Sequence, residues 1–189
     1  MQWGPRKGGF SWRVGETGQF SKGQITKIVR KALRAWKSIA NLKFRRQRNS
    51  ADTRISFQPT THSADGESST FGTGVLAHAY LVPQFVHLNG GGFSFSLGQS
   101  REVPLLEVVA HELGHNLGLD HSYGSDDLMQ PNTRNKDYTS VTFSATDKQR
   151  IQAIHGPPVL NSASFAEILE WVPGKRKEST WRSGKWTVT

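Results

Sequence analysis

Three histidines and one glutamate lie within eleven consecutive residues of the chain, in the stretch HELGHNLGLDH. His111 and His115 are four residues apart, so a helix would project both imidazoles from one face, about one turn apart. Glu112 then lies beside this pair, and Gly118 permits a turn that brings His121 back towards it. The spacing predicts a metal site with three imidazole ligands and one open coordination position.

A zinc ion with three protein ligands and an open position is typical of catalytic rather than structural sites. Zinc lowers the pKa of a bound water towards about 7, and Glu112 could take a proton from that water as it attacks a carbonyl. The alternative is that these histidines only satisfy polar groups around a buried helix. A glycine seven residues after His111 and a histidine ten residues after it favour the metal site.

The elements that must position this motif can be predicted from hydrophobic periodicity. Ser21 begins a capping-box pattern, and apolar residues then recur at helical spacing as far as Ala40. The histidine motif falls in a second helix over residues 103–117, and a third helix is expected over 144–154, ending at Gly156. Alternating apolar and polar residues predict strands at 9–14, 42–44, 55–57, 74–80 and 85–88.

The length of the chain suits one domain with an appendage. At 189 residues it can form one good core, which we assign to residues 1–157. Residues 158–189 form a basic tail with a short helical pattern at 164–171 and no assigned role. No apolar run is long enough to span a bilayer, so we expect no membrane span. The chain contains no cysteine, so any metal must be held by histidine, carboxylate or backbone oxygen.

The chain carries a formal net charge of +9, which favours contact with acidic partners. Ten of its 24 basic residues fall between Lys22 and Arg48, and much of this patch is explained by the solvated face of the first helix. No aromatic-interleaved recognition motif accompanies the patch. Nucleic acid is therefore not expected to be the main partner.

HELGHNLGLDHS, followed by Met129, resembles the zinc-binding sequence and Met-turn of the metzincins, and within them of the matrixins. The stretches ADTRISF and GVLAHAY and the last helix are also similar to a matrixin catalytic domain, so the resemblance covers about residues 5–156. It implies an α+β fold with a twisted five-stranded mixed sheet, three helices and a zinc cleft between upper and lower subdomains. The implied activity is that of a zinc-dependent endopeptidase acting on protein or peptide substrates.

The resemblance also bears on the setting of the domain. It implies an extracellular or secreted protein and is compatible with a monomer, although the first thirty residues contain no secretory signal. The cysteine-bearing propeptide motif of the family is absent, so the chain is expected to be active as it stands. The alternative from a different class is a basic binding or structural protein that retains a metalloprotease-like fold.

A second constellation matches the structural zinc of matrixins. By resemblance its four ligands are His62, Asp65, His78 and His87, although two residues separate the first pair where the family usually has one. A closed site of this kind would stabilise a loop. The alternative for His62 and His87 is that they are ordinary loop or strand residues. Calcium is a secondary candidate, because Asp52 matches a calcium-ligand position without its usual partners and could equally be a turn carboxylate.

The resemblance also assigns the substrate cleft. An extended substrate would add as a further strand to the edge strand that contains Leu76 and Ala77. The wall of the pocket for the residue after the scissile bond is matched by Pro131, Asn132 and Thr133.

Two further residues are assigned to the surroundings of the zinc. Met129 would pack beneath the metal as a floor, and its alternative is an ordinary buried methionine. Glu107 lies one helical turn before His111 and matches a pocket-lining position, so we expect better acceptance of basic or polar substrate residues there. The alternative is that Glu107 turns away and pairs with a nearby basic residue.

Overall fold

The structure, a computed structural model, describes residues 9–81, 84–97, 103–133, 139–159, 180–182 and 185–187. The chain divides into two compact units, residues 1–158 and 159–189. In the second unit, β10 (Thr180–Arg182) and β11 (Lys185–Thr187) form an antiparallel pair. The helical pattern expected at 164–171 lies outside the described residues. No helix in the described part of the chain is long and apolar enough to cross a membrane.

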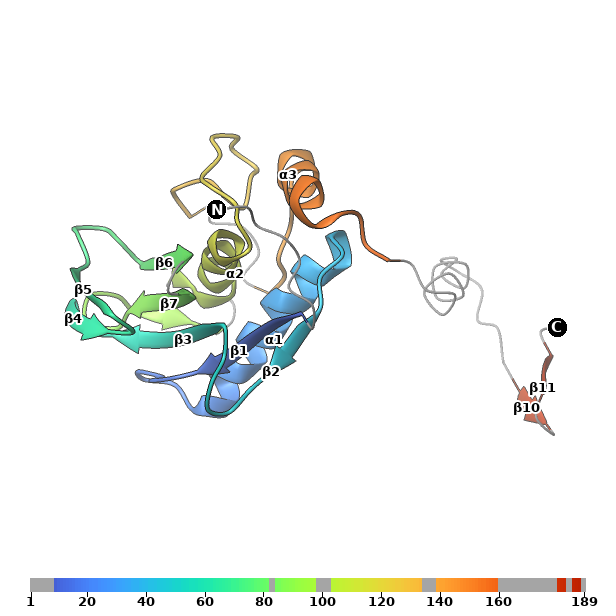
Figure 1. The fold of residues 1–189 in the computed structure, drawn as a ribbon, viewed down its shortest axis with the longest axis horizontal. Helices are drawn as coiled ribbons and strands as arrows, with labels where there is room; N and C mark the ends of the chain where they lie inside the picture. The colour runs from blue at the N-terminus through green and yellow to red at the C-terminus, as the bar shows by residue number, and fades with distance from the viewer. Residues whose placement is uncertain are drawn as a thin grey trace. The chain divides into compact units, whose positions relative to one another are not determined.

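The first unit contains a five-stranded sheet in the order β2-β1-β3-β7-β6 (Figure 1). Its strands are β1 (Phe10–Val14), β2 (Phe44–Arg46), β3 (Thr53–Gln58), β6 (Ala77–Leu81) and β7 (Gln84–Asn89). The first four in spatial order pair in parallel, whereas β6 runs antiparallel to β7 and forms an edge. With α1 (Lys22–Ile39), α2 (Leu105–Asn116) and α3 (Ala145–His155) in the described residues, this is the α+β fold that the resemblance implied.

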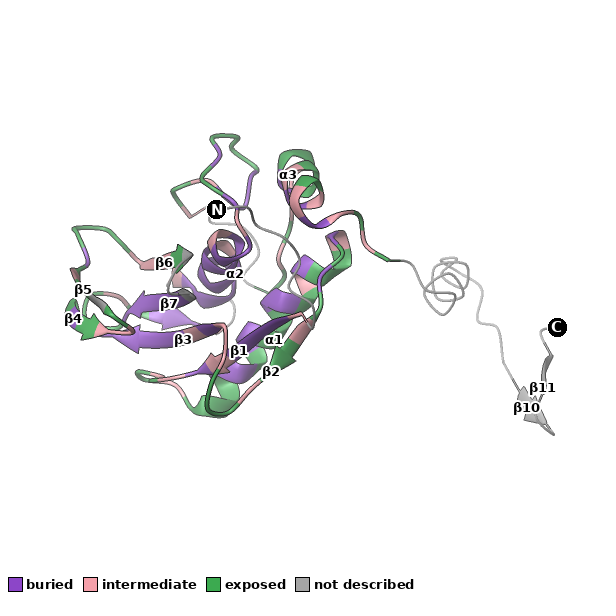
Figure 2. Ribbon diagram, viewed as in Figure 1, coloured by how far each residue is buried: buried purple, intermediate pink, exposed green. Residues whose placement is uncertain are grey.

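Helix α1 begins and ends where its sequence signals predict. The Ser21 side chain accepts from Gln24 N at 3.2 Å, and the Gln24 side chain accepts from Ser21 N at 2.8 Å, which completes the capping box. The apolar face of α1 is buried, and Trp36 Nε1 donates to Ala110 O at 2.9 Å, which joins α1 to α2. Figure 2 shows this inner face and the central strands as the buried core.

Helix α2 begins two residues later than expected. Val103–Pro104 instead forms the short strand β9, paired in parallel with β8 (Phe95–Ser96). A proline disfavours helical geometry in the residue before it, so Val103 is extended and the helix begins after Pro104. The edge strand β6 likewise begins at Ala77 rather than at residue 74. Gly74 has φ +81°, a left-handed conformation that breaks an extended strand.

A hairpin that the sequence patterns did not predict lies between β3 and β6. Strands β4 (Thr61–Ala64) and β5 (Glu67–Thr70) pair antiparallel with Ala64 opposite Glu67, so the loop is only two residues long. Both loop residues are left-handed, Asp65 with φ 54° and Gly66 with φ 85°. Asp-Gly is among the preferred sequences for this tight turn, because its two central residues need positive φ.

Candidate active site

Helix α2 and the turn after it bring three histidines together. His111 and His115 project from the same face of α2, and their ring centroids are 4.8 Å apart. The ring of His121 is centred 5.3 Å from His111 and 4.8 Å from His115. One nitrogen from each ring lies within 4.8 Å of the others, which is the spacing that a single metal ion requires.

The turn that returns His121 depends on a glycine. Gly118 has φ +96°, and its N–H donates to His115 O at 2.9 Å. The next amide, Leu119 N, donates to Gly114 O at 3.0 Å, so α2 ends in a tight left-handed turn. A side chain at position 118 would strain this backbone, because only glycine adopts it readily.

The hydrogen bonds of His111 and His115 fix where their protons lie. His111 Nδ1 donates to Leu128 O at 2.8 Å, and His115 Nδ1 donates to Leu119 O at 2.7 Å. Both neutral rings therefore carry their proton on Nδ1 and a lone pair on Nε2. These two Nε2 atoms face each other 3.1 Å apart, so two acceptors point at a shared position.

A cation resolves this acceptor–acceptor contact. Two nitrogens bound at 2.0–2.1 Å to one tetrahedral zinc lie about 3.4 Å apart, close to the spacing of these rings. Burial lowers the pKa of His115, and that favours the neutral imidazole that a metal needs. The residues present therefore fit a three-histidine zinc site.

Glu112 lies in the same turn of α2 and is almost fully buried, with 6% of its surface exposed. Its Oε2 atom has no hydrogen-bond partner. Burial raises the pKa of Glu112 to about 8, since water no longer solvates the carboxylate. A divalent cation on the neighbouring histidines would oppose that shift by favouring the charged form. With a metal bound to the histidines, this environment would suit a proton acceptor.

Met129 packs against α2 close to the histidines and is fully buried. A Cβ atom on Gly114 would collide with the Met129 sulfur and lie 3.0 Å from Trp36 Cζ2, so only glycine leaves room for the methionine. Met129 O accepts from Ser122 N at 2.9 Å. The methionine segment is thereby tied to the residue that follows His121.

Asp147, which the sequence patterns did not single out, anchors the same segment from α3. Its Oδ2 atom accepts from Leu128 N at 2.7 Å and from Ser144 N at 3.0 Å, and its Oδ1 accepts from Met129 N at 3.4 Å. Ser144 and Asp147 form a capping box, a signal that was visible in the sequence. The hydrogen bonds that Asp147 accepts from residues 128 and 129 join distant parts of the sequence, so no local pattern predicts them.

Asn116, which the sequence patterns also did not single out, holds the end of α2 against the sheet. Its Nδ2 atom donates to Tyr80 O at 2.8 Å and Phe85 O at 3.3 Å, and its Oδ1 accepts from Thr53 Oγ1 at 2.6 Å. Asn116 is fully buried. It therefore fixes the histidine helix relative to the edge strand β6.

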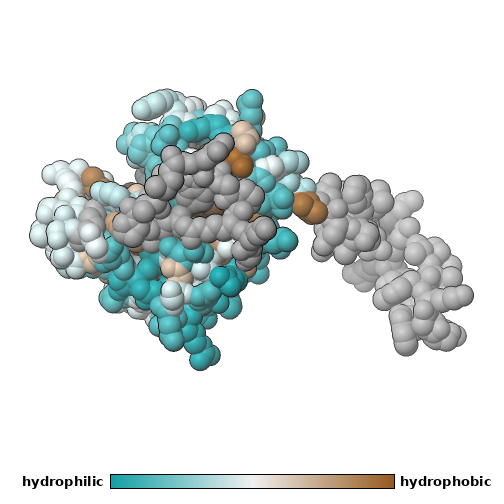
Figure 3. Space-filling model, in the orientation of Figure 1, coloured by the Kyte–Doolittle hydropathy of each residue, from teal (hydrophilic) through white to brown (hydrophobic). Residues whose placement is uncertain are grey.

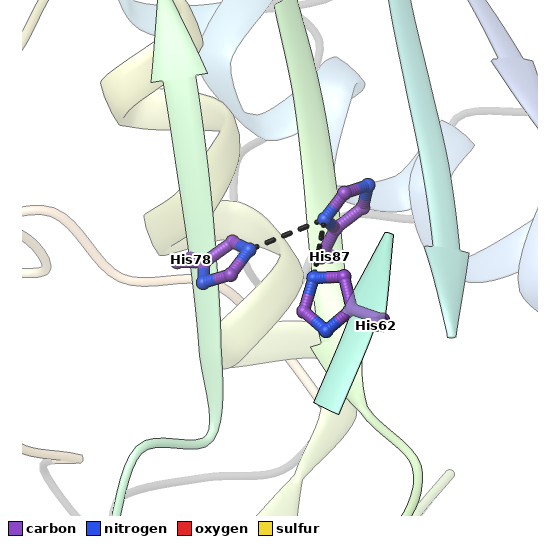
Figure 4. Close-up of side chains that lie close together, drawn as sticks. All are labelled: His62, His78 and His87. Carbon is purple, nitrogen blue, oxygen red and sulfur yellow. Dashed lines mark hydrogen bonds between the residues drawn. The ribbon is translucent and has the colours of Figure 1, made fainter. Parts of the chain in front are cut away.

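A second group of three histidines lies at the sheet edge (Figure 4). His62 comes from β4, His78 from β6 and His87 from β7. His87 Nδ1 lies 3.0 Å from His62 Nε2 and 3.2 Å from His78 Nε2, the contacts dashed in Figure 4. His78 and His87 are opposite each other in the β6–β7 register, so strand pairing itself brings them together.

The proton positions again indicate a cation. His62 Nδ1 donates to Pro59 O at 3.1 Å, and His87 Nε2 donates to Asp65 Oδ2 at 3.1 Å. The remaining nitrogens, His62 Nε2 and His87 Nδ1, are therefore both acceptors although they are in contact. These three imidazoles thus also fit a zinc ion.

The structure does not bring Asp65 into this triad, which differs from its assignment as a fourth ligand. Its carboxylate lies behind His87, and both oxygens accept from Arg54 Nη1 at 2.9 Å. Burial raises the pKa of Asp65, but the hydrogen bonds from Arg54 and His87 outweigh this and lower it. Asp65 instead lies in the two-residue turn between Ala64 and Glu67.

Asp52, the candidate calcium ligand, is engaged elsewhere. Its Oδ2 atom accepts from Ser11 N at 2.7 Å and from Ser11 Oγ at 2.6 Å. The described residues contain two groups of three or more histidine or acidic ligands close enough to hold one metal, namely the two histidine triads.

The residues assigned to the substrate cleft lie around α2 and β6. Leu76 and Ala77 are half-buried at the start of the edge strand, and Glu107 is buried in the first turn of α2 with 6% of its surface exposed. Pro131 and Asn132 are exposed and Thr133 is half-buried. Residues 134–138, which follow them, lie outside the described part of the chain.

The domain has a mixed sheet with helices packed on it. Three histidines converge on and after α2, and a buried methionine packs against that helix. These features define a domain of the metzincin class. The matrixin family model matches residues 2–156, and the chain belongs to the matrixin family.

Several matrix metalloproteinases are similar to this chain. Human neutrophil collagenase is 32% identical over 148 residues, which are 74% of this chain and 30% of that protein. Human matrix metalloproteinase-20 is 33% identical over 161 residues, 80% of this chain and 32% of that protein. Mouse matrix metalloproteinase-21 is 28% identical over 180 residues, 89% of this chain and 30% of that protein. The chain therefore spans about a third of the length of these relatives.

Proposed function

We propose that the chain is a zinc-dependent endopeptidase that hydrolyses peptide bonds of protein substrates. The observation that carries this proposal is the contact between His111 Nε2 and His115 Nε2, two lone-pair nitrogens 3.1 Å apart with His121 facing them. The buried carboxylate of Glu112, with an oxygen that has no partner, supports it. Membership of the matrixin family gives independent support.

His111, His115 and His121 hold the zinc ion in this proposal. Zinc, when bound there, polarises the scissile carbonyl and makes water a better nucleophile. Glu112 takes a proton from the attacking water and delivers it to the leaving amine nitrogen. The carbonyls of Leu128 and Leu119 keep Nε2 of the first two histidines free of protons, so both rings remain competent ligands.

The substrate lies extended along β6. As the edge of the sheet, β6 can accept a further strand through main-chain hydrogen bonds, beginning near Leu76 and Ala77. The substrate residue after the scissile bond enters a pocket near α2. Its lining comprises Glu107, Pro131, Asn132 and Thr133. Met129 supports the floor of the zinc site.

The second triad holds a structural zinc. His62, His78 and His87 supply the ligands, and Asp65 orients His87 from behind through its Nε2–H. This ion would join β4, β6 and β7, and so stabilise the edge of the sheet next to the substrate. We retain the extracellular location and the monomeric state as part of this proposal, with calcium as a secondary candidate cofactor.

Cleavage of casein by the purified chain tests the proposal. We expect fragments that disappear with the zinc chelator 1,10-phenanthroline and return when zinc is added back, with two zinc ions per chain. An inhibitor of serine proteases is the matched control and should have no effect. Absence of cleavage by a folded, zinc-loaded chain would favour the alternative of a basic binding protein. Cleavage that persists in the chelator would exclude the zinc mechanism.

A further inference from the structure

A cavity of about 300 Å³ lies between α1 and Arg46 of β2 and is lined mainly by cations. Figure 3 shows hydrophilic residues gathered over the lower part of the described domain, where Figure 1 draws α1 and β2. We call this site the α1 cavity. Its polar lining consists of Lys22, Thr26, Lys27, Arg30, Arg34 and Arg46.

Among the residues that the structure describes, no carboxylate compensates the positive charge of the α1 cavity. Five of its lining residues are cationic and none is acidic, and α1 itself contains no carboxylate. The nearest acidic residues in the sequence are used elsewhere, since Glu16 pairs with Arg54 and Asp52 bonds Ser11. In the described part of the chain, none of the five cations forms an ion pair.

The cations are also arranged in a row. Three of them, Lys22, Arg30 and Arg34, lie with Thr26 at four-residue spacing along α1, over about 18 Å. Arg30 and Arg34, like charges four residues apart, repel each other, so the pairing does not favour the helix. A row of this kind matches a linear ligand with repeated negative charges.

Two of the guanidinium groups have defined supports. Arg34 Nε donates to Arg30 O at 3.3 Å, and the Arg46 guanidinium lies over the Trp12 ring, 5.8 Å from its centroid. Each support uses only part of the guanidinium, so further N–H donors remain for an anion. The cavity thus contains partly positioned arginines as well as lysines.

Thr26 provides an independent indication of a ligand. It lines the cavity between Lys22 and Arg30, and only 6% of its surface is exposed. Its Oγ1 atom has no hydrogen-bond partner, whereas buried hydroxyls are normally satisfied. An oxygen of a bound ligand in the cavity could accept this hydrogen bond.

We propose that the α1 cavity binds a linear acidic polysaccharide through its sulfate or carboxylate groups. The volume exceeds that of a single small anion, and guanidinium forks suit oxyanions in two-point contacts. Nucleic acid is less well matched, because single-strand binders also use aromatic stacking platforms, and no aromatic residue lines the cavity. The site uses none of the histidines of the two metal centres.

Heparin oligosaccharide binding by the full chain, followed by fluorescence anisotropy, tests this inference. The test variant is the double substitution Arg30→Gln and Arg34→Gln, and the matched control is Lys37→Gln with Lys43→Gln. The control removes the same charge from exposed positions outside the cavity. We expect at least about a tenfold weaker Kd for the test variant and less than about a threefold change for the control. Casein cleavage and thermal melting should be unchanged in both.

Several outcomes would overturn the proposal. Equal weakening in the two variants would mean that heparin responds only to net charge, and failure of the wild type to bind heparin would remove the site. Thr26→Val, which preserves shape, should weaken binding a few-fold without lowering the melting temperature. Uncharged dextran should not bind. Tighter binding of a single-stranded oligonucleotide than of heparin, lost in the same test variant, would reassign the cavity to nucleic acid.

Discussion

Asp147 Oδ2 accepts a hydrogen bond from Leu128 N at 2.7 Å, and Leu128 O in turn accepts from His111 Nδ1 at 2.8 Å. One residue of the chain thus connects the start of α3 to a proposed zinc ligand. The aspartate also closes the capping box with Ser144. Because it is fully buried, removal of the carboxylate leaves these amides without their partner.

Asp147→Ala should therefore destabilise the fold and loosen the zinc site together. We expect a loss of about 2–4 kcal/mol in the free energy of unfolding, from the lost cap and from buried amides left without a partner. Zinc affinity at the His111 site should fall by about tenfold, because the carbonyl that orients His111 is no longer held. Urea unfolding and competition with a chromophoric chelator measure the two effects. Gln149→Ala, an exposed change on the same helix, is the control.

Normal zinc affinity in Asp147→Ala, alongside the expected loss of stability, would contradict the link through Leu128. It would mean that Asp147 acts only as a helix cap.

Asp127 should make stability depend on pH in the acidic range. The nearby Ser144 side chain lowers the pKa of this buried carboxylate, and a hydrogen bond from Gly124 N at 3.1 Å contributes to the same shift. A lowered pKa stabilises the fold above the unfolded value of about 3.9, and this contribution is lost as the pH falls through the folded pKa. Asp127→Asn should therefore be less stable than the wild type at pH 7, with a difference that shrinks below about pH 4. Urea unfolding at both pH values measures this difference, and an equal difference at the two values would contradict it.

The main elements were predictable because their signals are local. The capping box at Ser21 located α1, and the residue types and spacing of His111, His115 and His121 were enough to indicate a metal site. The start of α2 was predicted two residues too early. Pro104 disfavours helical geometry at Val103, and hydrophobic periodicity does not report this effect.

Other features depend on partners distant in the sequence. Asn116 bonds residues 53, 80 and 85, so its role appears only when helix and sheet are packed together. Asp65 shows a different limitation. The Asp-Gly pair is a signal for a hairpin turn, but the assignment of Asp65 as a metal ligand did not take this turn into account.

Asp65→Asn tests whether this carboxylate orients His87 or binds the metal. We expect the second zinc to be bound about 10–100-fold more weakly, because the variant weakens the support behind His87 and leaves three imidazole ligands. X-ray absorption should show an unchanged set of nitrogen ligands. Loss of an oxygen ligand in Asp65→Asn would show that Asp65 binds the metal directly.

His78→Ala removes a ligand of the second zinc. The variant should lose this zinc and melt at a lower temperature, while the zinc at His111 is retained.

Glu107→Leu tests the assignment of the substrate pocket. Glu107 is buried one turn before His111 on α2, and a carboxylate there should favour basic or polar substrate residues after the scissile bond. The variant should shift the cleavage profile of a peptide library towards leucine at that position. Its total rate of library cleavage serves as the control for general damage. An unchanged profile would mean that Glu107 does not reach the pocket.

The central claim is tested most directly by peptide hydrolysis and zinc content measured together on Glu112→Ala and the wild type. In the proposed mechanism Glu112 provides the proton transfer but no metal ligand, so the variant should fold normally and keep its zinc. Hydrolysis should nevertheless fall by at least about a hundredfold. A zinc-loaded variant that retained most of the wild-type rate would contradict the proposal that Glu112 is the general base of a zinc endopeptidase.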